Sequence, residues 1–141
     1  MRRLHKTILI LFILIISTSC EKLEIKHDLV GEWKLFGSGG GIAGTGATLN
    51  YNSLILNNKD AYQNIRNDSI IENGTYRISK NDLDFMNSIC SFKIKFTQVS
   101  RVGYSANQLG SYTYLIQMIS QDTLALIEPY YDGFDYYYSR Q

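Results

Sequence analysis

The sequence predicts an all-β domain, an antiparallel up-and-down barrel of about eight strands. Three observations point to this fold class. Apolar side chains recur with a period of two, long 3.6-residue helical patterns are absent, and the 141-residue chain holds one proline but 11 tyrosines. Period-two alternation is typical of strands with one buried face, and tyrosine is a good strand former.

The alternating runs define the side chains expected inside the barrel. Phe92, Ile94 and Phe96 give the clearest example, because two lysines lie between them and a serine and a threonine flank the run. The same pattern adds Trp33, Leu35, Leu54, Leu56, Tyr76, Ile78, Ile116, Met118, Leu124, Leu126, Tyr136 and Tyr138. So many large side chains nearly fill a barrel of about eight strands. We therefore expect a modest cavity at most, open near the glycine-rich loop at 39–46 and closed near Trp33.

Turn residues separate the runs. Asp132-Gly133 is the dipeptide that a two-residue type I′ hairpin prefers, because both central residues need positive φ. Asn67-Asp68 and Asn73-Gly74 compete for the tip of an earlier hairpin, and the sequence alone does not choose between them. Residues 98–111 contain two glycines and predict a longer loop.

The first 19 residues have the pattern of a secretory signal peptide. Arg2, Arg3 and Lys6 form a basic n-region, and an unbroken apolar run of nine residues follows at 8–16. As a helix this run would span about 14 Å, roughly half of a bilayer core, so it is too short for a transmembrane helix. It fits the apolar region of a signal peptide.

Small residues at 17–19 lead directly to Cys20, and this pattern resembles the bacterial lipobox. The resemblance implies cleavage before Cys20 and acylation of its sulfur, with acyl chains as the membrane anchor. Ordinary secretory cleavage beside a coincidental cysteine is the alternative. Because Glu21 follows rather than aspartate, we expect the outer membrane of a bacterial cell envelope. The predicted organisation is a signal peptide at 1–19, a lipidated N-terminus and tether at 20–28, and the barrel at 29–141.

Composition limits the chemistry of the mature chain. Removal of a leader with three of the 14 basic residues leaves 122 residues, with 11 basic and 13 acidic side chains and a formal charge of −2. Nucleic-acid binding is not expected without a basic surface. His27 and Cys90 are the only histidine and the only second cysteine that remain, so neither a metal site nor a nucleophile with its base is predicted. We expect no cofactor and no enzymatic activity.

Gly31-Glu32-Trp33 stands at the start of the first expected strand and resembles the G-x-W motif of lipocalins. In that family a basic residue near the chain end packs across the tryptophan and closes the barrel. The resemblance assigns this closing role to Arg140, together with Gly31 and Trp33. Gly74-Thr75-Tyr76 and the run at 122–126 are also similar to the small lipocalin-like lipoproteins of bacterial envelopes. The resemblance implies a binding barrel.

Tyrosines supply the candidate binding residues. Inward tyrosines can orient a ligand through their hydroxyls, which makes Tyr76, Tyr114, Tyr136 and Tyr138 the candidates. A cluster of five tyrosines crowds the last expected hairpin, at positions 130, 131, 136, 137 and 138, and cross-strand aromatic pairing would explain it without any function. The leading hypothesis is non-catalytic binding of a small apolar or amphipathic ligand. The alternative is a module or inhibitor that contacts an envelope protein through its loops and a surface tyrosine cluster.

Overall fold

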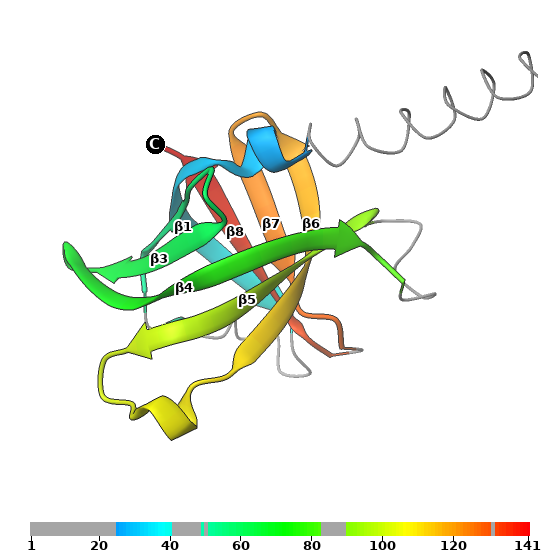
Figure 1. The fold of residues 1–141 in the computed structure, drawn as a ribbon. Helices are drawn as coiled ribbons and strands as arrows, with labels where there is room; N and C mark the ends of the chain where they lie inside the picture. Colours follow the sequence, from blue (N-terminus) through cyan, green and yellow to red (C-terminus); the bar gives the residue numbers. More distant parts are fainter. Residues whose placement is uncertain (1–24, 41–48, 50, 83–89, 131) are drawn as a thin grey trace, which may run out of the picture.

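Eight antiparallel strands close into a barrel in a computed structural model that describes residues 25–40, 49, 51–82, 90–130 and 132–141. Each strand pairs with its neighbour in sequence, and the last pairs with the first (Figure 1). This confirms the predicted up-and-down barrel. The elements are β1 (Gly31–Gly40), β2 (Ser53–Leu56), β3 (Ala61–Arg66), β4 (Ser69–Lys80), β5 (Phe92–Arg101), η2 (Ala106–Gln108), β6 (Ser111–Ser120), β7 (Thr123–Ile127) and β8 (Phe134–Arg140).

The barrel has two different ends. At the closed end lie a helical turn at 25–29, the β2–β3 turn at 57–60, the β6–β7 turn at 121–122 and the C-terminus. The helical turn and the C-terminus lie together at the top of Figure 1. At the opposite end, which we name the open end because the partly exposed Gln98, Arg101 and Tyr112 lie there, are the β3–β4 turn, the β5–β6 connection with η2 and the β7–β8 connection.

The helical turn at 25–29 covers the closed end. Leu29 is fully buried, and Ile25 packs against the interior core. The indole Nε1 of Trp33 donates a hydrogen bond of 2.8 Å to the carbonyl of Leu29, which fixes the turn over the first strand. The segment expected as a tether up to residue 28 therefore ends in structure that packs on the barrel. Cys20 and the signal-peptide region lie outside the described residues.

The interior is packed with the side chains that the alternation predicts. Every member of the expected inward set lies in the core cluster or packs against it. Leu29, Tyr62 and Tyr112 join them without having been predicted. Cys90 belongs to a second, smaller cluster with Leu115, and burial raises the pKa of its thiol. Its environment is that of a small buried hydrophobe.

Two of the turn predictions are resolved by the structure. The tip of the β3–β4 hairpin is Asn67-Asp68, where φ is 49° and 60°, the left-handed values that a type I′ turn needs. Asn73-Gly74 instead lies inside β4 at a β-bulge opposite β5. β5 extends to Arg101, so the loop expected at 98–111 is confined to 102–110.

The predicted type I′ hairpin at Asp132-Gly133 is wrong. β7 ends at Ile127 and β8 begins at Phe134, so the connection is longer than two residues, and Gly133 lacks positive φ. Glu128 accounts for the difference. Its backbone N–H donates to the carbonyl of Phe134 at 2.9 Å, and its carboxylate accepts a hydrogen bond from the Phe134 N–H at 3.2 Å. These bonds stabilise a wider connection before β8.

Candidate functional site

The predicted contact between the first and last strands is present. Trp33 and Arg140 face each other in the β1–β8 ladder, and the guanidinium carbon of Arg140 lies 4.3 Å from the centroid of the Trp33 ring. The guanidinium also donates to the carbonyls of Asp28, Val30 (3.0 Å) and Gln121 (3.2 Å). Arg140 thus joins the helical turn, β1 and the β6–β7 turn at the closed end.

Gly31 is needed beside this contact for a steric reason. Its φ is 148°, which side chains rarely adopt, and a Cβ atom there would lie 2.8 Å from Nη1 of Arg140. The glycine therefore leaves room for the guanidinium to reach the indole. The glycine and the tryptophan of the G-x-W pattern both serve the packing of one arginine.

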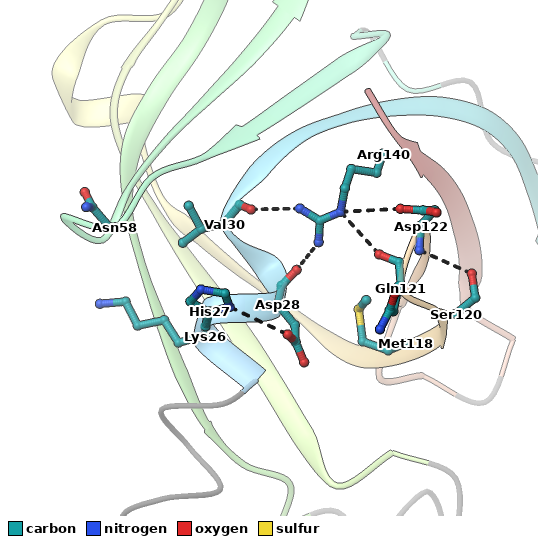
Figure 2. A pocket seen from close by; sticks show the side chains of 10 residues that line it. All are labelled: Lys26, His27, Asp28, Val30, Asn58, Met118, Ser120, Gln121, Asp122 and Arg140. Carbon is teal, nitrogen blue, oxygen red and sulfur yellow. Dashed lines mark hydrogen bonds and ion pairs between the residues drawn. The ribbon is translucent and has the colours of Figure 1, made fainter.

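A cleft of about 970 Å³ opens beside Arg140 (Figure 2). Its charged groups are already partnered: Lys26 pairs with Asp60 at 2.6 Å, and Arg140 pairs with Asp122 at 3.9 Å besides its carbonyl contacts. These pairs connect the helical turn and the strand turns, so we assign the cleft to barrel closure. It is lined by Lys26, His27, Asp28, Val30, Asn58, Met118, Ser120, Gln121, Asp122 and Arg140.

A buried carboxylate near the open end is the main feature that the sequence analysis missed. Glu72, near the start of β4, points into the barrel and is 6% exposed. Its Oε1 accepts hydrogen bonds from the Tyr62 hydroxyl at 2.9 Å, Asn64 Nδ2 at 3.0 Å and the Tyr112 hydroxyl at 2.5 Å. A buried carboxylate needs such partners, because desolvation without them is costly.

The second oxygen of Glu72 contacts groups on β5. Gln98 Nε2 donates to Oε2 at 2.8 Å, and Arg101 Nε lies 3.5 Å from the same oxygen. Tyr112, Gln98 and Arg101 are only partly buried, so solvent reaches the edge of this group from the open end. We call this set the Glu72 cluster: Tyr62, Asn64, Glu72, Gln98, Arg101 and Tyr112.

One atom of the cluster lacks a partner. Asn64 is 1% exposed, and its Oδ1 accepts no hydrogen bond from any residue that the structure describes. Its Nδ2 donates both to Glu72 and, at 3.3 Å, to the Tyr112 hydroxyl. Exchanging the amide oxygen and nitrogen would set an acceptor against the carboxylate, so the network determines the orientation. A buried acceptor without a donor costs about 1–3 kcal/mol.

The tyrosine hydroxyls around the cluster resist ionisation. Burial, the largest effect, raises the pKa of Tyr51, Tyr112 and Tyr114 well above the ordinary value of 10.0. The charge of Glu72 raises each of these pKa values further. This half of the interior therefore combines one carboxylate with phenols that resist ionisation, and it disfavours additional negative charge.

The four predicted tyrosines all lie inside the barrel, but they do not form one site. Tyr76 donates a 2.7 Å hydrogen bond to the carbonyl of Asn57 at the closed end. Tyr136 donates to Glu128 at 3.2 Å, and the hydroxyls of Tyr138 and Tyr51 are 2.9 Å apart. The ring of Tyr114 packs edge-to-face against those of Tyr136 and Tyr112, with centroids 5.7 Å apart in each pair. Tyr114 thus connects the predicted tyrosines to the Glu72 cluster.

Comparison with known proteins adds no further assignment: no protein-family model matches the chain, and no curated protein matches it significantly. Within the described ranges, no helix is long and apolar enough to cross a membrane. In the same ranges, no three histidine, cysteine or acidic side chains gather as a metal site would require. The arrangement itself defines a closed barrel whose two ends differ: the Trp33–Arg140 contact and the cleft lie at one end, and the Glu72 cluster lies toward the other.

Proposed function

We propose that this chain is a lipoprotein of the bacterial cell envelope whose barrel is a non-catalytic, lipocalin-like binding domain. The closed eight-stranded barrel and its tryptophan–arginine closure support the lipocalin-like part of the proposal. The basic, apolar and small-residue pattern that ends at Cys20 supports the anchor in the outer membrane.

The ligand that this barrel suits is small and amphipathic. The observation that carries the proposal is the Glu72 cluster, a buried polar group beside the open end of an otherwise apolar barrel. Binding sites of this kind combine apolar walls with a few placed polar groups that orient the ligand. The rings of Tyr112, Tyr114 and Tyr136 offer apolar surface next to the cluster.

A titration followed by protein NMR tests the binding function. The protein is the mature-length chain 20–141 with Cys20→Ser, which keeps the whole described barrel. Small amphiphiles with an eight-carbon chain and different head groups are added separately. We expect saturable shifts of interior residues near the open end, with Trp33 at the closed end unaffected. The proposal fails if no member of the panel produces a saturable shift.

A protein-interaction module is the second candidate, because apolar side chains are exposed at the open end. Val99 on β5 and Val102 after it are 64% and 68% exposed, and Ile70 and Tyr104 lie on neighbouring segments. The predicted tyrosine cluster is divided, since Tyr136 and Tyr138 are buried, whereas Tyr130 is 69% exposed. This candidate predicts that Val99→Lys with Val102→Lys abolishes cross-linking to a specific envelope protein. The binding candidate predicts that the same variant keeps amphiphile binding.

A further inference from the structure

We propose that the Oδ1 atom of Asn64 receives a hydrogen bond from a neutral hydroxyl or amide group of the ligand, and that the interior site rejects carboxylates. The ligand class is thus a small amphiphile with an uncharged donor head, such as an alcohol or a primary amide. This inference rests on the proposed binding function and specifies the chemistry of the ligand head group.

The Glu72 cluster lacks one hydrogen-bond donor among the described residues. Tyr62 and Tyr112 already donate their hydroxyl hydrogens to Glu72, and Asn64 donates through Nδ2. The buried acceptor that remains is Asn64 Oδ1, for which no described residue supplies a hydrogen. An alcohol or amide supplies that hydrogen, whereas an ether or a carboxylate of the same size does not.

Charge disfavours an anionic head. Arg101 is the one cation of the cluster, and it is engaged with Glu72 while it stacks on the Tyr104 ring at 4.3 Å. A ligand carboxylate would lie beside a buried carboxylate that has already used this cation. Desolvating a second, unpaired negative charge costs more than one hydrogen bond returns.

Asn64 lies toward the end of the barrel from which we expect the ligand to enter. Asn64 is close to the end of β3, where the strand approaches the tip at Asn67-Asp68. Tyr112, which accepts from Asn64 Nδ2, is partly exposed at the start of β6. The centroid of its ring lies 5.2 Å from that of the Phe96 ring, which belongs to the hydrophobic core. A ligand whose head group binds Asn64 would place its aliphatic tail beside these rings.

Three ligands of matched length test the head-group chemistry: octanol, the methyl ether with the same number of heavy atoms, and octanoate at neutral pH. Their dissociation constants for the Cys20→Ser mature chain are measured by NMR, with the Asn64 side-chain amide as the local signal. We expect octanol to bind at least about tenfold more tightly than either other ligand, which corresponds to about 1.4 kcal/mol. The Asn64 amide should shift only with octanol.

A pair of variants on β3 assigns the effect to Asn64. Asn64→Leu removes the unpaired acceptor, and we expect it to abolish the preference for octanol over the ether. Gln63→Leu changes a neighbouring residue that faces outward, and it should keep the preference. If Asn64→Leu does not fold, the ranking of the three ligands and the Asn64 signal in the unchanged chain still test the inference.

Each outcome is informative. Equal binding of the three ligands, the result expected if Asn64 holds only a water molecule, overturns the inference and leaves the binding function standing. Tightest binding of octanoate overturns it as well, and so does an Asn64→Leu variant that keeps the octanol preference. If no ligand binds, the proposed function fails and this inference fails with it.

Discussion

Trp33 and Arg140 are direct cross-strand partners of β1 and β8, and the guanidinium carbon lies 4.3 Å from the indole centroid. The same guanidinium reaches carbonyls of the helical turn and of the β6–β7 turn. One residue next to the C-terminus therefore connects three separate segments. A planar group with several fixed donors suits this role, whereas a lysine ammonium offers a single point charge.

Arg140→Lys should lower the free energy of unfolding by about 1–2 kcal/mol, because lysine keeps the charge but loses the multidentate contacts and the planar stacking. Urea unfolding of the variant measures this value. Arg77→Lys on the exposed face of β4 is the matched control and should change stability by less than about 0.5 kcal/mol. Equal effects of the two substitutions would contradict the role given to Arg140.

Trp33→Ala should cost about 3–5 kcal/mol, because it leaves a cavity at the closed end. It also leaves the Leu29 carbonyl without the indole donor, so the helical turn should loosen. Circular dichroism during urea unfolding measures the loss, and hydrogen exchange at 25–30 reports on the turn. Phe36→Ala on the same strand removes a ring that is 63% exposed and should cost far less.

Gly74→Ala should destabilise the barrel by about 2–3 kcal/mol through overpacking. A Cβ atom at Gly74 would lie 2.1 Å from the Thr97 carbonyl oxygen and 2.8 Å from the Tyr62 ring. Since backbone cannot yield easily, β4 must shift away from β5, and the Tyr62–Glu72 hydrogen bond should weaken with it. Thermal unfolding measures the effect. Gly110→Ala, where a Cβ atom meets nothing within 4 Å, should be nearly neutral and serves as the control.

The barrel should lose stability as the pH rises from about 10 to 12. Burial, with a smaller contribution from a neighbouring carboxylate, raises the pKa of Tyr76 and Tyr136 from 10.0 to about 12. A raised phenol pKa means that the unfolded chain loses these protons first. The stabilisation is therefore complete below pH 10 and disappears as the pH passes the folded values. Tyrosinate absorbance, compared with the same titration in urea, should show delayed ionisation. Coincident curves would contradict the prediction.

Cys20→Ser should abolish acylation and leave the leader uncleaved by the lipoprotein peptidase. Mass spectrometry of the mature N-terminus and its partition into detergent measure the change. Cys90→Ser should keep the acylated N-terminus, since Cys90 is a buried core residue. A mature chain that begins at a residue other than an acylated Cys20 would refute the anchor.

The barrel could be predicted from the sequence because alternation acts locally. Each strand carries its own pattern, and the residues at 92–96 illustrate how charged and apolar side chains separate onto two faces. The Trp33–Arg140 contact came instead from a family resemblance, since nothing local links two residues so far apart in the chain. The β7–β8 connection was predicted wrongly because backbone and side-chain bonds of Glu128 outweigh the local preference of Asp132-Gly133.

The Glu72 cluster was missed although β4 contains a signal for it. Glu72, Gly74, Tyr76 and Ile78 occupy every second position of β4. The alternation therefore already placed a carboxylate on the inward face. Polarity alone would assign such a residue to solvent. The partners that make its burial tolerable come from β3, β5 and β6, and only the closed barrel brings them together.

The helical turn at 25–29 also sets which way the barrel would face on a membrane. Because this turn is packed over the closed end, only residues 20–24 would separate an acylated Cys20 from it, a reach of about 17 Å at most. So short a tether would hold the end with Trp33 toward the bilayer and direct the end near Asn64 to the aqueous side. A cargo molecule would then be captured from the surrounding fluid or handed over by another protein, and not drawn directly out of the leaflet to which the chain is attached.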